Sequence, residues 1–332
     1  MTEHPGPSKH PGPSEYDGPS EYVIAVDVGG TSIKGAVVNR AMRQVARLRL
    51  PTPRGEGPRA VVDAVAEVLR RLAEHAPGAA AGVVVPGIVD EPSQHALYSA
   101  ALGWRDLPLA ALLSEVTGLS VTLGHDVRAG GMAEARLGAA RGADDVLFCA
   151  VGTGISAALL LDGRPVSGQG YAGELGHVLT DPAGTACACG GCGCLEAVAS
   201  AAAIAAAYGA RSGRAVTGAA QVAELKAAGD RGAEEVWNRA VTALAMALTS
   251  SVSLLSPQVI VMGGGLCEAG ELLLGPLRQQ LEQRLTFHRR PTVVRAALGD
   301  QAGCLGAGLL AWETEEGASE PAACTVACGG AQ

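Results

Sequence analysis

The feature that most constrains the fold of this 332-residue chain is a cluster of thiols near its middle. Four of the nine cysteines fall within the eight residues from Cys187 to Cys194, and glycines separate them. Glycine allows tight backbone turns, so several sulfur atoms can point at one centre. His177 precedes the cluster by ten residues, and thiolate and imidazole are the ligands that zinc prefers. The segment therefore predicts a structural zinc site.

Two carboxylates flank the thiol cluster. Glu174 lies three residues before His177, and Glu196 lies two residues after Cys194. A purely structural zinc site does not need them, and they could be ordinary surface glutamates. Alternatively, the metal site aims His177 and both glutamates at a polyhydroxyl ligand. The spacing alone does not separate these two interpretations.

Two other segments share a pattern of strand, turn with glycine and hydroxyl residues, and returning strand. Strands are predicted over 23–26 and 33–38 in the first segment, and over 146–151 and 157–161 in the second. Glycine lets backbone N–H groups approach anionic oxygens, and hydroxyl groups add donors. An ordinary tight hairpin would look the same, but two such turns could grip phosphates from both sides. The candidate phosphate-binding residues are Asp27, Gly29, Gly30, Thr31, Ser32 and Lys34 in the first segment, and Gly152, Thr153 and Gly154 in the second.

Two further strand ends carry candidate functional residues. Asp126 lies between a predicted strand, 121–123, and a predicted helix, 128–137, where an aspartate could cap the helix or act as a general base. Asp27, at the end of the first strand, could hold Mg²⁺ through water. Gly263, Gly264 and Gly265 follow a predicted strand at 259–262 and would let a flat or charged ligand lie against the backbone, although a tight turn alone could also explain them.

Length and composition point to a two-domain α/β protein. The chain is long enough for two cores, and apolar periodicity predicts further helices over 58–75, 221–226, 234–255 and 276–285 and strands over 43–50, 81–85 and 293–296. The net charge of −8 argues against a nucleic-acid or anionic-membrane surface. The N-terminus lacks the apolar region of a signal peptide, which favours a cytoplasmic protein with unpaired cysteines. The uncharged run over 240–267 is interrupted by serines and Pro257, which favours a buried helix and strand over a membrane span.

The thiol segment resembles the signature of the ROK family, which contains bacterial sugar kinases and sugar-responsive repressors. The family pattern is Gly-His, a spacer, and then Cys-x-Cys-Gly-x-x-Gly-Cys-x-Glu. The matching residues are Gly176, His177, Cys187, Cys189, Gly190, Gly193, Cys194 and Glu196. The resemblance implies zinc on His177, Cys187, Cys189 and Cys194, and sugar contacts from Glu174, His177 and Glu196. Cys192 falls at a variable position, so five candidate ligands compete for four places.

Other segments resemble the same family in the same order along the chain. The Asp-x-Gly-Gly-Thr turn resembles the first phosphate motif of the actin-like ATPases, the turn at Gly87 would belong to the sugar pocket, and Gly263–Gly265 would lie beside the nucleotide. In the family, an Asn-Asp pair supplies the general base that accepts the proton of the sugar hydroxyl. Asp126 matches this base, whereas His125 replaces the asparagine. His125 is therefore a candidate sugar contact that would change the hexose preference and could titrate near physiological pH. The asparagine that often precedes the family's Gly-Trp pair is absent before Gly103.

The resemblance implies an actin-like/ribonuclease H-like ATPase fold of two α/β domains with a central cleft. The expected domains are residues 22–124, completed by a closing helix over 302–312, and residues 125–301, which contain the zinc motif. Residues 1–21 and 313–332 are expected to be disordered tails.

The implied activity is ATP-dependent phosphorylation of a hexose hydroxyl, with structural Zn²⁺, with Mg²⁺ accompanying ATP, and with a homodimer or homotetramer as the assembly. Glucose, yielding glucose 6-phosphate, is the default substrate; N-acetylmannosamine, N-acetylglucosamine or another hexose stays open, as does the phosphoryl donor. A repressor of the same family is disfavoured because only 21 Pro/Gly-rich residues precede the first strand. A sugar sensor without catalysis is disfavoured by Asp126 and the two phosphate turns.

Overall fold

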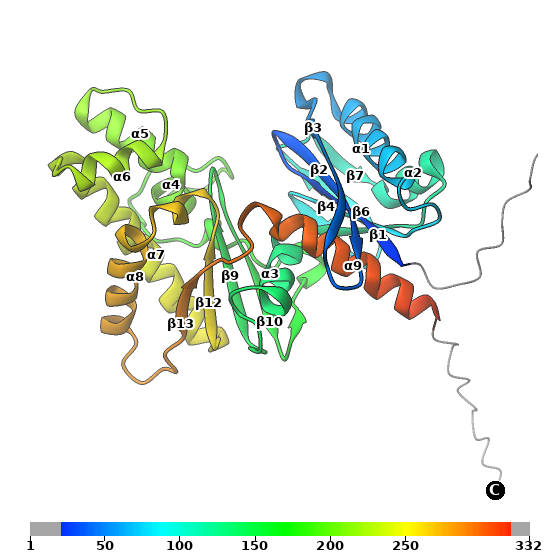
Figure 1. Ribbon diagram of the computed structural model, residues 1–332. Coiled ribbons are helices and arrows are strands. Elements are labelled where there is room, and N and C mark those ends of the chain that lie inside the picture. Colours follow the sequence, from blue (N-terminus) through cyan, green and yellow to red (C-terminus); the bar gives the residue numbers. More distant parts are fainter. Residues whose placement is uncertain (1–20, 320–332) are drawn as a thin grey trace, which may run out of the picture.

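The computed structural model describes residues 21–319, which form two α/β lobes joined by a long helix (Figure 1). The disorder predicted for the two ends of the chain lies largely outside the described residues. Each lobe is built on a five-stranded sheet, and a small third sheet is attached to the first lobe.

The first sheet has the strand order β3-β2-β1-β4-β8. Its strands β1, β2 and β3 form an antiparallel meander, and β4 and β8 continue it in parallel. Both faces of β1 are covered, which explains why its sequence is an almost continuous apolar run. The strands are β1 (Tyr22–Val28), β2 (Ser32–Asn39), β3 (Gln44–Pro51), β4 (Ala81–Val85) and β8 (Val121–His125). Helices α1 (Pro58–Ala73) and α2 (Leu109–Thr117) cover one face, and α9 (Ala302–Ser319) covers the other.

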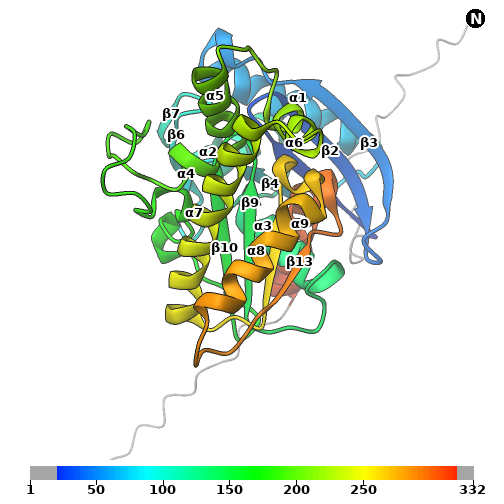
Figure 2. The same ribbon diagram turned by 90° about the vertical axis from the view of Figure 1, so that its left-hand side faces the viewer.

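The second sheet repeats this arrangement in the order β11-β10-β9-β12-β13. The hairpin β9–β10 is antiparallel, and β12 and β13 continue from β9 in parallel. The strands are β9 (Val146–Val151), β10 (Ile155–Leu161), β11 (Arg164–Pro165), β12 (Val259–Gly263) and β13 (Thr292–Arg295). Helix α3 (Asp126–Leu137) packs on one face. The opposite face is covered by helices that Figure 2 shows in front of the sheet, namely α4 (Glu196–Ala199), α5 (Ala201–Ser212), α6 (Ala219–Ala227), α7 (Arg231–Leu255) and α8 (Glu271–Arg284).

Helix α9 connects the lobes, because it packs on the first sheet and also on α3 of the second lobe. It continues through Ser319, beyond its predicted end at Trp312. The acidic residues that suggested a tail are held by the folded chain: Arg136 pairs with Glu313 and Arg40 pairs with Glu316. Glutamate and alanine also favour helix, so the composition fits the longer helix.

The small sheet contains strands that the sequence did not predict. They are β5 (Ile88–Asp90), β6 (His95–Ser99) and β7 (Trp104–Leu107), all antiparallel. These strands are short, and β5 and β7 contain charged residues, so they lack the apolar runs that marked the strands of the two large sheets. The side chain of Gln94 joins this unit to the edge of the first sheet, since it accepts the N–H of Leu123 at 2.6 Å and donates to the Leu123 carbonyl at 3.3 Å.

The uncharged run over 240–267 forms the second half of α7, strand β12 and the turn after it, as predicted. Within residues 21–319, no helix is both long enough and apolar enough to cross a bilayer.

Candidate active site

Two partly buried carboxylates from different elements interact with each other: Asp27 at the end of β1 and Asp126 at the start of α3. Burial raises the pKa of Asp126 to about 6, against the opposing effects of the Val127 N–H and the positive charge of Arg128. Burial likewise raises the pKa of Asp27 to about 6; Lys34 lowers it, and the negative charge of Asp126 raises it further. The structure therefore brings the predicted general base and the predicted Mg²⁺ site into one electrostatic environment.

The helix cap at this junction is His125, not Asp126. Strand β8 continues to His125, and the Nδ1 atom of this ring accepts the backbone N–H of Arg128 at 3.2 Å. Asp126 is the first residue of the helix, and its Oδ1 accepts the N–H of Val127 at 2.7 Å. The interpretation of Asp126 as the cap is therefore wrong, which leaves its carboxylate available for chemistry.

His125 is also uncharged, which corrects the expectation that it titrates near physiological pH. Burial and then the positive charge of Arg128 lower its pKa to about 3. Because Nδ1 accepts a hydrogen bond, the proton of the neutral ring is on Nε2. Nε2 lies 3.5 Å from Oδ1 of Asp126. The neutral ring of His125 thus lies next to the carboxylate that we interpret as the base.

The first predicted phosphate turn is held from both sides. The Thr52 hydroxyl donates to the Gly29 carbonyl at 2.6 Å, and the Gly29 N–H donates to the Ser32 carbonyl at 3.0 Å. Lys34 lies 3.6 Å from Asp27 and pairs with Asp300, so its ammonium group stays at the end of β1. Gly30 and Thr31 complete this turn between β1 and β2.

The second turn, Gly152–Gly154, contacts the helix that follows the thiol segment. Oε2 of Glu196 accepts the Ile155 N–H at 2.7 Å, and a Cβ atom at Gly154 would lie 2.7 Å from the same oxygen. A side chain at position 154 would therefore force the Glu196 carboxylate to shift, and Thr153 lies between the two glycines. Glu196, predicted as a sugar contact, uses one carboxylate oxygen to fix the turn.

Packing explains two of the three glycines at the end of β12. Gly264 has φ +85°, and a side chain there would overlap the backbone of Val151. A Cβ atom at Gly263 would lie 2.8 Å from the ring of Phe148. Gly265 faces open space. Gly87, in the predicted sugar-pocket turn, has φ +112°, and a side chain there would overlap the Tyr98 carbonyl, so β6 packs directly on that turn.

The thiol segment gathers four of its five candidate metal ligands. The ligand atoms of His177, Cys187, Cys189 and Cys194 all lie within 4.8 Å of one another. Nδ1 of His177 is 3.8 Å from the Cys187 sulfur, and the sulfurs of Cys189 and Cys194 are 3.7 Å apart. Tetrahedral zinc with sulfur ligands at about 2.3 Å would separate its ligand atoms by about 3.5–4 Å. The donor set therefore fits zinc, and Cys192 is exposed and outside the group.

His177 faces the metal ligands with one nitrogen and Glu174 with the other. Nε2 of His177 lies 3.8 Å from Oε2 of Glu174. Burial raises the pKa of Glu174, and the negative charges of Glu196 and Asp126 add to this effect while His177 opposes it. The carboxylates predicted to bind sugar and the predicted base therefore interact with one another.

Sequence reasoning missed two charged residues beside the base. Arg128 is only 2% exposed, and its Nε donates to Oε1 of Glu91 at 3.1 Å. The sequence signal for Arg128 was its position in the first turn of α3 before three small residues, Ala129, Gly130 and Gly131. Glu91 gave no signal, because it lies in a turn of the small sheet that the sequence did not predict.

Comparisons with known proteins agree with this architecture. The sequence profile of the ROK family matches residues 23–314. A glucokinase from Thermotoga maritima is 32% identical over 302 residues, covering 86% of this chain and 95% of the relative. An N-acetylmannosamine kinase from Citrobacter koseri is 33% identical over 299 residues, covering 87% of this chain and 98% of the relative.

A solved structure extends the likeness to three dimensions. The ROK family glucokinase from Streptomyces griseus in complex with glucose and AMPPNP is 29% identical and has a TM-score of 0.76, covering 88% of this chain and 99% of the solved chain. The predicted actin-like ATPase fold and the predicted family are therefore confirmed: this chain belongs to the ROK family.

Proposed function

We propose that this protein transfers the terminal phosphoryl group of ATP to a hydroxyl of a hexose, with glucose as the first candidate. Two relatives named glucokinase, one of them solved with glucose and AMPPNP, support this assignment. The observation that carries it in this structure is Asp126, a partly buried carboxylate at the first turn of α3 that interacts electrostatically with Asp27 of the first phosphate turn.

Asp126 would act as the general base. A sugar hydroxyl is a weak nucleophile until its proton has an acceptor, and a carboxylate within hydrogen-bond reach supplies one as the bond to phosphorus forms. A pKa near 6 leaves Asp126 mostly ionised at neutral pH while keeping it more basic than an ordinary aspartate. The Nε2–H of His125 would help to hold the carboxylate in place, and Glu174 and His177 would bind sugar hydroxyls.

The two glycine turns would position the phosphates. Backbone N–H groups of Gly29–Ser32 and Gly152–Gly154 would donate to phosphate oxygens, and Lys34 would add positive charge. Asp27 would hold Mg²⁺ through water, and Gly263–Gly265 would lie beside the nucleotide. Catalysis would then depend on positioning and on neutralisation of phosphate charge.

The four-ligand group would hold a structural zinc ion. Zinc bound by four protein ligands supplies folding energy rather than a reaction step. Its effect on the active site would pass through His177, which faces Glu174 with its second nitrogen, and through Glu196, whose carboxylate holds the second phosphate turn.

N-acetylmannosamine is the second candidate substrate, because a kinase for that sugar is as similar to this chain as the glucokinase is. Assembly as a homodimer or homotetramer and a cytoplasmic location stay predictions. Light scattering after size-exclusion chromatography measures the first of these.

A substrate panel tests the proposed function. Purified protein, ATP and Mg²⁺ should phosphorylate glucose or an N-acetylhexosamine, and Asp126→Asn should lower kcat by about 10² or more with little change in sugar affinity. Asp63→Asn, which alters an exposed aspartate paired with Arg59 on α1, is the matched control and should leave kcat unchanged. Wild-type protein that binds a hexose calorimetrically but phosphorylates none with ATP or another donor would be a sensor.

A further inference from the structure

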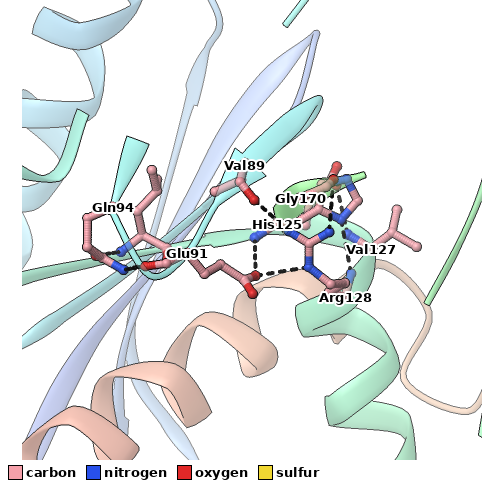
Figure 3. A network of polar contacts seen from close by, with 9 residues as sticks. Val89, Glu91, Gln94, His125, Val127, Arg128 and Gly170 are labelled. Atoms are coloured by element: carbon pink, nitrogen blue, oxygen red, sulfur yellow. Dashed lines mark hydrogen bonds and ion pairs between the residues drawn. The ribbon is translucent and has the colours of Figure 1, made fainter. Parts of the chain in front are cut away.

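Arg128 is a buried cation whose guanidinium group donates to three partners (Figure 3). Its Nε donates to Oε1 of Glu91 at 3.1 Å, and its terminal nitrogens donate to the carbonyls of Val89 at 2.9 Å and Gly170 at 3.4 Å. Burying a guanidinium group is costly unless it is paired and hydrogen-bonded. A charged side chain kept in this environment, two residues after Asp126, therefore needs an explanation.

Glu91 connects this arginine to the start of α3. Its Oε1 atom accepts both the Arg128 Nε–H and the backbone N–H of His125, each at 3.1 Å. The turn that carries Glu91 is itself fixed, because the side chain of Gln94 donates to the Glu91 carbonyl at 2.5 Å and also bonds the Leu123 backbone. The Glu91 carboxylate is thus fixed at the backbone N–H of His125, the residue that precedes Asp126.

Arg128 also joins the two lobes. Val89 is in β5 of the small sheet, and Gly170 is in a one-turn 3₁₀ helix (Gly168–Gly170) of the second lobe. Gly170 has φ +94°, and a Cβ atom there would lie 2.6 Å from the Val89 carbonyl oxygen, so the two backbones are in direct contact. The guanidinium group donates to a carbonyl on each side of this contact. Glu174, a proposed sugar ligand, follows four residues after Gly170.

We propose that Arg128 is a positioning residue for phosphoryl transfer: its guanidinium group fixes Asp126, the small sheet and the loop that leads to Glu174 as one unit. The inference rests on the proposed function, because Arg128 acts through the proposed base. It assigns Glu91 as the partner that orients the guanidinium group.

The charge of Arg128 adds a signature that a purely structural role would not produce. The groups that act on Asp126 or respond to its charge are Arg128 and His125 on or before α3, Asp27 on β1 and Glu174 before the thiol segment. His125 is neutral, Asp27 and Glu174 are carboxylates, and Arg128 lowers the pKa of Asp126. Arg128 also lowers the pKa values of Glu174 and His125. Loss of that charge should raise the pKa of the base together with these two and move the acid limb of kcat to higher pH. The pKa of Asp27 depends on burial and on the charges of Lys34, Asp126 and Asp300. Removal of the Arg128 charge therefore leaves the direct interactions of Asp27 unchanged.

The test compares three variants through the pH profile of kcat with the best hexose from the panel. Arg128→Met should lower kcat by about tenfold or more and move the acid limb to higher pH by at least half a pH unit. Arg128→Lys keeps the charge but loses the planar fork, so kcat should fall while the acid limb stays near the wild-type position. Arg136→Met removes an exposed charge from the same helix, where Arg136 pairs with Glu313, and should change neither quantity.

Glu91→Gln keeps the test decisive if Arg128→Met does not fold. The amide is isosteric and Arg128 keeps its charge, so kcat should fall at least threefold with an unmoved acid limb. A folded Arg128→Met with the kcat and acid limb of the wild type would overturn the inference and leave the proposed function intact. Wild-type kcat in both Arg128→Lys and Glu91→Gln would also overturn it. Wild-type protein that phosphorylates no hexose would instead remove the proposed function.

Discussion

At the scale of single residues, Asp126 and Asp27 lie where burial disfavours the charged form of a carboxylate. The pKa of Asp126 is about 6 in the folded protein against an ordinary value of 3.8. The folded state therefore binds this proton more tightly than the unfolded state does. Ionised Asp126 lowers stability above pH 6, and this penalty disappears as the pH falls below 4, where both states are protonated.

This sign predicts that Asp126→Asn stabilises the protein while it removes activity. Asparagine can still accept the Val127 N–H but carries no charge. We expect its free energy of unfolding to exceed that of the wild type by on the order of 1 kcal/mol at pH 8, and the difference to shrink at pH 5. Urea denaturation at both pH values, without Mg²⁺, measures it. A difference that is independent of pH would show that burial does not raise the pKa of Asp126.

The sequence indicated that His125 and Asp126 lie at a junction between a strand and a helix, but it did not predict which of them caps the helix. Strand β8 was predicted to end at residue 123, and it continues to His125. That shift of two residues makes His125 the cap and Asp126 the first helical residue. The neutrality of His125 could not be predicted either, since it depends on burial and on Arg128, whose environment is built by turns far away in sequence.

At the scale of elements, the thiol segment is a short irregular stretch that touches several parts of the site. It contains no long helix or strand, and isolated bridges pair Leu179 with Cys194 and Ala186 with Cys192. Backbone hydrogen bonds also cross it, among them Cys187 N–H to the Gly191 carbonyl and Gly193 N–H to the Thr185 carbonyl. The sequence predicted that four side chains of this segment gather, because ligand spacing is a local property that one stretch of chain displays completely.

We predict one zinc ion per chain, bound by the four-ligand group. Cys189→Ser should lose the metal and lower the midpoint of thermal unfolding by several degrees, because metal binding is coupled to folding. Cys192→Ser alters an exposed thiol outside the group and should retain the metal. Elemental analysis of both variants, together with thermal unfolding, measures the difference. Fully folded wild-type protein without metal would contradict the assignment.

The longer strands and helices of the two large sheets could be predicted because they satisfy a simple period, whereas the two-residue strand β11 shows none. Strands buried on both faces give short apolar runs, as in β4 and β9, and α1 shows apolar residues at helical spacing. The small sheet could not be predicted in this way, because β7 contains two charged residues and β5 has three residues. These short strands are stabilised by contacts with distant segments, and they carry the Glu91 turn that completes the site.

At the scale of the whole molecule, α9 lies between the lobes with very close backbone contacts. A side chain on Gly82 of β4 would overlap the Ala307 carbonyl of α9, and a side chain on Gly306 of α9 would overlap the Ala129 carbonyl of α3. Glycine at these positions lets one helix pack directly on both lobes. The predicted domain boundary between residues 124 and 125 stays a prediction, and it falls one residue before the end of β8.

The contact between α9 and α3 predicts that Gly306→Ala impairs both stability and turnover. A methyl group at this position must push α9 away from α3, and α3 carries Asp126 at its first turn. Overpacking of a buried contact costs about 1–3 kcal/mol, so the free energy of unfolding should fall by this amount. Because the displacement reaches the base, kcat should fall more than the sugar affinity does.

A glycine-to-alanine change on another helix separates this effect from helix propensity. Gly209 lies in α5, and the nearest atom to its added Cβ would be the Arg214 carbonyl oxygen at an ordinary 3.5 Å. Gly209→Ala should therefore leave kcat unchanged and stabilise the protein by up to about 1 kcal/mol, the usual gain from alanine in a helix. Urea unfolding and steady-state kinetics on both variants provide the measurement. If Gly306→Ala matched Gly209→Ala in both kcat and free energy of unfolding, the spacing between α9 and α3 would not control the position of Asp126. The two helices could then move apart by the width of a methyl group without loss of activity.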